Sequence, residues 1–95
     1  MERKITPEAH AAVLRKVALT ALRDARDAQK KARATPTEAC VRAAFHACVF
    51  AARAARNAAK ALPKGEREEL LLEGTHMATL GEALKNQLVR IAVTE

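Results

Sequence analysis

The segment AARAARNAAK, residues 51–60, decides how this chain folds. Alanine is the only apolar residue in it, so none of its apolar side chains is larger than a methyl group. Alanine is the strongest helix former and arginine and lysine follow closely, which predicts a helix. Small side chains let a second helix approach closely while larger residues of that neighbour fill the space. We therefore predict that residues 51–60 form a docking groove for other helices.

The composition of the whole chain indicates an all-α fold. Its 95 residues include 23 alanines but only three glycines and three prolines, the residues that interrupt helices. A chain of this length is long enough for one modest core and too short for two. We predict a single helical domain over residues 1–95.

Each of the first two helices is predicted to begin at a Thr-Pro pair. A threonine side chain accepts a free backbone N–H group of the first turn, and proline suits the first helical position. Such pairs occur at Thr6-Pro7 and Thr35-Pro36, so the two threonines are the predicted N-caps. Proline and glycine in the LPKGE segment should end the second helix. The predicted helices run from about 7 to 33 and from about 36 to 62.

The third predicted helix carries a glycine in its interior. Gly74 weakens the helical pattern that begins near residue 66, and Thr75 could cap a new helix. We predict that this helix is bent or split near Gly74, into sections of about 66–73 and 75–93. Short turns between three helices favour an up-down-up bundle with the alanine-rich helix in the centre.

The second predicted helix has an unusually wide apolar surface, which includes Phe45 and Phe50. The surface covers about two-thirds of the helix circumference, whereas a helix with one neighbour needs a stripe of only about 100°. This width predicts packing against both other helices, and surplus alanine surface could meet a second copy of the chain. A homodimer is therefore predicted. The residues assigned to helix packing or self-association are Ala51, Ala55, Ala58 and Ala59.

Positive charge is concentrated in the first two helices. Residues 1–65 hold 14 cations and five anions, whereas residues 66–95 hold three cations and six anions. A line of cations along one helix can bind an acidic protein or the phosphates of a nucleic-acid duplex. Alternatively, Glu66, Glu69 and Glu73 of the third helix pair with cations of the second. The residues assigned to partner or phosphate binding are Arg42, Arg53, Arg56, Lys60 and Lys64.

The sequence contains no motif for catalysis or cofactor binding. It has no glycine-rich phosphate loop, no nucleophile beside a base and no pair of carboxylates facing a pocket. Cys40 and Cys48 are eight residues apart on one helix, roughly 12 Å, which is too far for a disulfide. We therefore predict no enzyme activity, no cofactor and no metal. A metal or apolar-ligand carrier built around Cys40, Cys48 and Met77 is a third hypothesis.

The sequence also gives no sign of a membrane partner. It lacks an apolar run of the roughly 18 residues that a membrane span needs. The N-terminal MERKITPEAH, residues 1–10, has charges without an apolar core behind them, unlike a secretory signal. These features predict a cytoplasmic protein.

Two functional hypotheses follow from the basic, alanine-rich helices. The first is a small helical interaction, accessory or inhibitor protein that self-associates and binds another protein without catalysis. The alternative is a nucleic-acid-associated bundle that contacts phosphate backbones through the second helix. Because no aromatic residue lies among the cations, single strands with stacked bases are disfavoured and a duplex is favoured.

Overall fold

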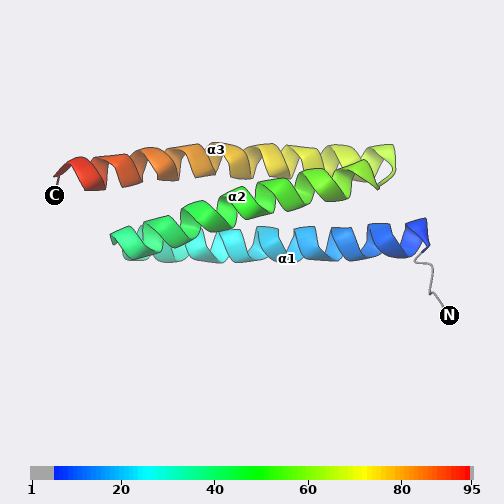
Figure 1. The fold of residues 1–95 in the computed structure, drawn as a ribbon, viewed down its shortest axis with the longest axis horizontal. Coiled ribbons are helices and arrows are strands. Elements are labelled where there is room, and N and C mark those ends of the chain that lie inside the picture. Colours follow the sequence, from blue (N-terminus) through cyan, green and yellow to red (C-terminus); the bar gives the residue numbers. More distant parts are fainter. Residues whose placement is uncertain (1–5, 95) are drawn as a thin grey trace.

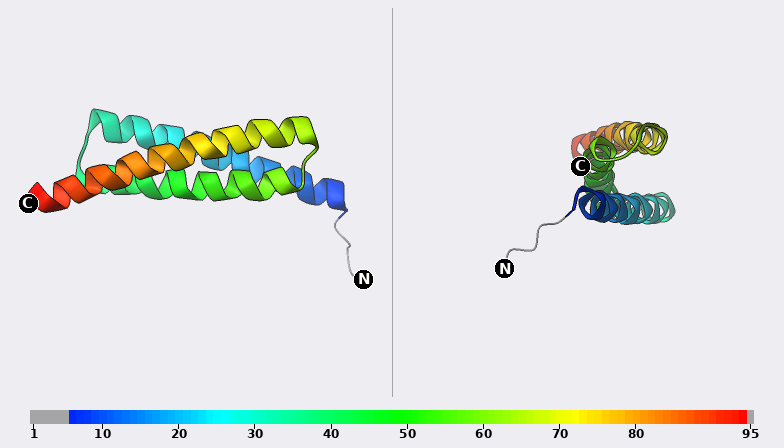
Figure 2. Two further views of the ribbon diagram at one scale, coloured as in Figure 1. Left: turned by 90° about the horizontal axis from the view of Figure 1, so that it is seen from above. Right: turned by 90° about the vertical axis from the view of Figure 1, so that its right-hand side faces the viewer.

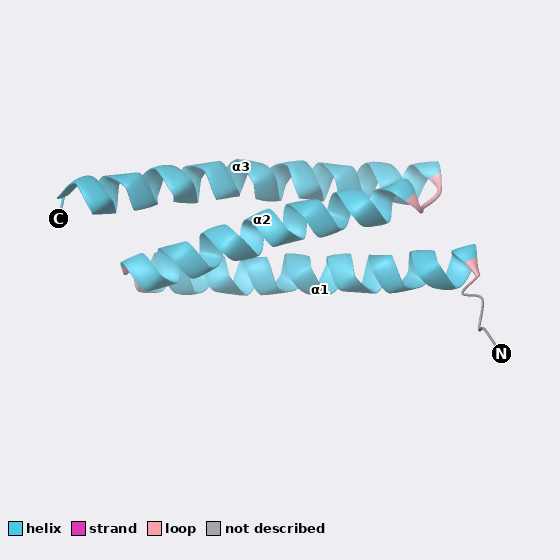
Figure 3. Cartoon of the chain, in the orientation of Figure 1, coloured by secondary structure: helices cyan, strands magenta, loops and turns pink. Residues whose placement is uncertain are grey.

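The computed structural model, which describes residues 6–94, contains three long helices (Figure 1). They are α1 (Pro7–Ala34), α2 (Glu38–Lys60) and α3 (Lys64–Thr94). Residues 6–94 include no strand (Figure 3). The prediction of an all-α fold with three helices is confirmed for this part of the chain. Residues 1–5, which belong to the stretch used to argue against a secretory signal, lie outside the described residues, as does residue 95.

The helix α2 lies between the other two. In Figure 1, α1 and α3 both begin at the right, whereas α2 begins at the left and passes between them. The end-on view in Figure 2 shows α3, α2 and α1 stacked in that order. α2 packs along the length of both neighbours, while α1 and α3 approach each other directly at only a few points. The result is an elongated body of 56 × 31 × 20 Å.

Threonine side chains cap the first two helices, but only one of them is the threonine that the sequence predicted. The Thr6 hydroxyl accepts the Ala9 backbone N–H at 3.1 Å, which confirms the predicted start of α1. The N-cap of α2 is Thr37, not Thr35, and its hydroxyl accepts the Cys40 N–H at 3.3 Å. Thr35 instead ends α1, where its N–H donates to the Lys31 carbonyl. Residues 35–37 reverse the direction of the chain. Thr35 therefore belongs to the end of α1, and Thr37 is the threonine that caps α2.

Alanine makes up most of the buried core. The larger buried side chains come mainly from the outer helices, with Leu22 in α1 and Leu70, Met77 and Leu84 in α3. They surround small residues of α2, because a methyl group leaves room for a neighbour's bulky side chain. The buried alanines of α2 are Ala44, Ala51, Ala52, Ala55, Ala58 and Ala59.

The helix α3 is continuous from residue 64 to residue 94, so the predicted split into 66–73 and 75–93 is wrong. Gly74 is buried against α2, where a Cβ atom added to it would lie 3.2 Å from the Ala55 Cβ. Thr75 does not cap a new helix, because its hydroxyl donates to the Leu71 carbonyl one turn earlier. The glycine permits close helix contact, and packing against α2 offsets its weak helix propensity of about 1 kcal/mol.

Candidate interaction surface

The five cations assigned to partner binding are all exposed. Four of them project from α2, and Lys64 is the first residue of α3. Arg42 donates a hydrogen bond to the Glu38 carboxylate one turn earlier. The other four make no ion pair with any residue in the described range 6–94. We call Arg42, Arg53, Arg56 and Lys60 the cation row; it runs along α2 for roughly 27 Å at 1.5 Å per residue.

Of the three glutamates predicted to pair with cations of α2, Glu66 and Glu73 pair with α1, and Glu69 forms no ion pair within residues 6–94. The Glu66 carboxylate lies 3.7 Å from the Arg15 guanidinium, and the Glu73 carboxylate lies 3.6 Å from that of Arg26. The predicted pairing of these two glutamates with α2 is therefore wrong. Both glutamates lie on the edge of α3 that faces α1, because the buried residues Leu70, Gly74 and Met77 turn the neighbouring edge toward α2. Within residues 6–94, Arg42 is consequently the one member of the cation row with an ion pair, and Arg53, Arg56 and Lys60 have none.

Three cations surround a hollow near the turn between α2 and α3. The hollow has a volume of about 410 Å³ and is lined by Arg56, Ala59, Lys60, Arg67 and Leu71. The Arg67 guanidinium is held in place because it donates to the carbonyls of Ala59 at 3.0 Å and Leu62 at 3.1 Å. A fixed guanidinium beside two exposed cations gives this hollow a positive potential.

Arg67 is a structural residue that the sequence analysis missed. The last carbonyl groups of a helix have no partner inside the helix, and an arginine side chain can satisfy two of them at once. The sequence did contain a signal for this role, because Arg67 is a cation just after the Pro63–Gly65 turn and its side chain is long enough to reach the end of α2. Its hydrogen bonds fix the end of α2 to the start of α3.

An exposed apolar patch lies beside the cation row. Phe50 of α2 is 59% exposed and Val17 of α1 is 44% exposed, and both line one shallow hollow together with Lys16, Thr20 and Asp24. Val13 continues the patch one turn earlier on α1 and is also exposed. The sequence analysis placed Phe50 in the apolar surface of α2, but the structure leaves it open to solvent. Phe50 lies between the cation row and the edge of α2 that packs against α1, and neither outer helix covers it.

The four alanines assigned to helix packing or self-association are buried within the chain. Ala51, Ala55 and Ala58 have no exposed surface, and Ala59 is almost fully buried. The neighbouring helices cover them completely. They therefore offer no surface to a second copy, and a homodimer would have to use other residues.

The two cysteines are free thiols. Cys48 is buried against the other helices, and this burial raises the pKa of its thiol because the charged form loses its hydration. Cys40 is half-buried. Within residues 6–94, no cluster of three His, Cys, Asp or Glu side chains is arranged to hold a metal ion. The hypothesis of a metal or apolar-ligand carrier built around Cys40, Cys48 and Met77 stays a prediction.

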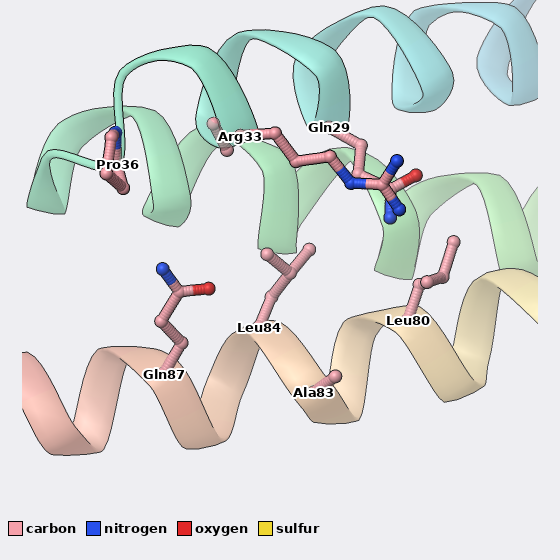
Figure 4. A pocket seen from close by; sticks show the side chains of 8 residues that line it. Gln29, Arg33, Pro36, Leu80, Ala83, Leu84 and Gln87 are labelled. Atoms are coloured by element: carbon pink, nitrogen blue, oxygen red, sulfur yellow. The ribbon is translucent and has the colours of Figure 1, made fainter.

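A separate cleft lies between α1 and α3 near the α1–α2 turn (Figure 4). It has a volume of about 400 Å³ and opens to solvent between the two outer helices. Its apolar walls come from Ala32, Pro36, Leu80, Ala83 and Leu84. Its polar groups are those of Gln29, Arg33 and Gln87.

Comparison with known proteins gives no relative for this chain. No protein family, curated protein or solved structure matches it. None of the helices within residues 6–94 has the length and apolar character to cross a bilayer. The candidate function therefore rests on the cation row, the apolar patch and the cleft.

Proposed function

We propose that this protein is a non-catalytic binding protein whose partner is an acidic protein. Its contact face consists of Val13, Val17, Phe50 and the cation row. The single observation that carries the proposal is the exposure of Phe50 next to Val17, with Arg53 less than one helical turn away. Aromatic and arginine residues contribute disproportionately to protein interfaces, and covering an exposed phenylalanine stabilises a complex by about 1–2 kcal/mol.

The charge of the contact face favours an acidic partner. Arg53, Arg56 and Lys60 have no ion pair among the described residues, so their charge is available to a second molecule. Complementary charge raises the association rate and fixes orientation, while the apolar patch supplies affinity. An accessory or inhibitor protein needs both, because it has to find one partner and remain bound to it.

The same charge argues against the contact face as a homodimer interface. At a two-fold interface each patch meets its own copy, so two cation rows would lie against each other. Like charges placed together cost free energy. The homodimer stays a prediction that a size measurement checks, and its interface would lie away from the cation row.

Site-specific crosslinking tests the contact face. A photo-crosslinking amino acid at position 50 is compared with the same residue at position 19, because Leu19 is 48% exposed on α1 and lies outside the contact face. We expect one crosslinked protein from position 50 and none from position 19. The captured protein is then purified and titrated with Phe50→Ala, Arg53→Glu and the control Leu19→Ala.

The binding measurement decides the outcome. We expect Phe50→Ala and Arg53→Glu each to weaken binding at least about tenfold, which is about 1.4 kcal/mol, and Leu19→Ala to bind as the unmodified chain does. Equal crosslinking from both positions, or unchanged affinity in the two contact-face variants, would reject the proposal.

A nucleic-acid duplex is the second candidate partner, and the hollow at Arg56, Lys60 and Arg67 favours it. Three cations around one concave site suit a backbone phosphate. Binding of a mixed-sequence duplex should weaken steeply as salt rises, and Arg56→Gln with Lys60→Gln should reduce both the affinity and the salt slope. The Phe50→Ala variant separates the two candidates, because the loss of an apolar side chain leaves phosphate contacts intact.

A further inference from the structure

Two ion pairs join the outer helices. Arg15 pairs with Glu66 and Arg26 pairs with Glu73, at 3.7 and 3.6 Å. The two glutamates are seven residues apart, a spacing that returns side chains to nearly the same edge of a helix. The two arginines are 11 residues apart on α1, so the pairs do not form a regular repeat. On α3 the residue seven positions after Glu73, near the same edge of the helix, is Leu80.

A cation of α1, Arg33, lies beside Leu80. Arg33 follows Arg26 by seven residues on α1, and it lines the same cleft as Leu80. Arg33 forms no ion pair with any residue of the described chain. In Figure 4 its guanidinium lies beside the Gln29 amide, while Leu80 and Leu84 project from α3 toward α1. An unpaired guanidinium thus stands next to an apolar wall.

We propose that this cleft binds a small aliphatic carboxylate. The ligand's carboxylate accepts hydrogen bonds from the Arg33 guanidinium, whose planar fork matches a carboxylate. The Gln29 amide N–H group is a second donor. The aliphatic body lies against Leu80 and Leu84, where it is removed from water.

The size and composition of the cleft restrict the ligand. Its volume of about 400 Å³ lies within the range for small-molecule sites and accommodates a short alkyl chain. The lining contains no aromatic side chain to stack on a ring, and leucines favour a flexible alkyl chain. A medium-chain fatty acid has both the charged head and the apolar body that the cleft requires. This site is separate from the contact face and does not depend on the proposed protein partner.

Octanoate is the probe for the first test, with octanol and acetate as matched comparisons. Octanol keeps the alkyl chain without the charge, and acetate keeps the carboxylate without the chain. We expect saturable 1:1 binding of octanoate by calorimetry, with chemical-shift changes confined to the residues around the cleft, and at least tenfold weaker binding of either comparison compound. Failure of octanoate to saturate, or equally tight binding of octanol, overturns the proposal.

Two variants of the full chain test the role of Arg33. Arg33→Gln removes the charge and should weaken octanoate binding at least tenfold, whereas Arg23→Gln removes a charge from a side chain of α1 that is 73% exposed and should leave it unchanged. Leu80→Glu supplies a carboxylate from α3 itself. We expect this variant to abolish octanoate binding, because the new carboxylate pairs with the Arg33 guanidinium and the cleft loses part of its apolar wall. Unchanged octanoate affinity in Arg33→Gln contradicts the proposal.

Discussion

Gly74 of α3 lies directly against Ala55 of α2. A Cβ atom added to Gly74 would come within 3.2 Å of the Ala55 Cβ and within 3.6 Å of the Ala52 carbonyl oxygen. The two helices can approach this closely because one residue has no side chain and the other has only a methyl group. Seven residues later, Gly81 lies on the same face with more space, since its added Cβ would be 3.8 Å from the nearest atoms of Cys48 and Val49.

Alanine substitution of the two glycines should have different effects. Alanine is favoured over glycine in a helix by about 0.5–1 kcal/mol, so Gly81→Ala should raise the free energy of unfolding by that amount. Gly74→Ala gains the same propensity but crowds Ala55, and overpacking costs about 1–3 kcal/mol. We expect Gly74→Ala to be less stable than Gly81→Ala by at least about 1 kcal/mol in urea denaturation. Equal stabilisation by the two substitutions would show that α2 and α3 are not in tight contact.

Enlarging a buried alanine of α2 should destabilise the fold. Ala51 has no exposed surface, so Ala51→Leu should force α2 away from its neighbours and cost about 1–3 kcal/mol. The matched control is Ala43→Leu on the exposed surface of the same helix, for which we expect a change within about 0.5 kcal/mol. Chemical denaturation of both variants measures the difference, and comparable losses would contradict the central position of residues 51–60.

Removing the Arg67 side chain should loosen the junction of α2 and α3. Its guanidinium donates to the Ala59 carbonyl in the last turn of α2 and to the Leu62 carbonyl in the turn after it, and each such charged hydrogen bond contributes about 1 kcal/mol when it is partly exposed. We expect Arg67→Ala to lower the free energy of unfolding by about 1–2 kcal/mol. Arg67→Lys keeps the charge, but a lysine ammonium cannot donate to both carbonyls as the planar guanidinium does. This variant should therefore retain less than half of the free energy of unfolding that Arg67→Ala loses. Arg90→Ala, at an exposed site of α3, is the control.

The ion pairs between α1 and α3 should contribute little to stability. The Arg26 side chain is 54% exposed and that of Glu73 is 35% exposed, so water screens their attraction. A double-mutant cycle with Arg26→Gln and Glu73→Gln should give a coupling free energy between about 0.2 and 1 kcal/mol that shrinks as salt is added. A coupling above about 2 kcal/mol, or one insensitive to salt, would mean that the pair is far less hydrated than the structure indicates.

Burial of Cys48 should make stability depend on pH in the alkaline range. Because burial raises the pKa of this thiol in the folded state, the unfolded chain releases its proton first as pH rises. The contribution to stability is complete below about pH 8.5, the ordinary pKa of a thiol, and declines above it toward the higher pKa of the folded state. Cys48→Ala should be less stable overall but show a shallower decline between about pH 8 and pH 10, measured by urea denaturation. Cys40→Ala is the control and should keep the steeper decline.

Local sequence chemistry determined where most helices begin and end. The start of α1 follows from Thr6 and Pro7, because an N-cap acts within a single turn. The number of helices follows from the few glycines and prolines. Helix propensity and capping involve only neighbouring residues, so they can be read without knowing the fold. Even so, Thr35 was the predicted cap of α2, and the reversal of the chain places Thr37 at that position instead.

Part of the candidate site was visible in the sequence. The cations of α2 share one edge of the helix, and all of them are exposed in the structure. Arg67 and Phe50 were not recognised, because the importance of each depends on a neighbouring element. Arg67 acts on carbonyl groups of a different helix, and Phe50 is exposed only because α1 does not extend over that edge of α2.

The sequence by itself determined three amphipathic helices, one of them lined with alanine and edged with positive charge. Only the tertiary structure decided that Gly74 permits contact instead of breaking α3, that Glu66 and Glu73 face α1, and that Arg33 lies in a cleft beside Leu80. The physical reason is that the rotation of each helix about its own axis depends on all its packing contacts together. If a helix turned about its own axis by a fraction of a turn, its charged side chains would lie beside a different neighbour. The local sequence pattern does not show which orientation the helix adopts.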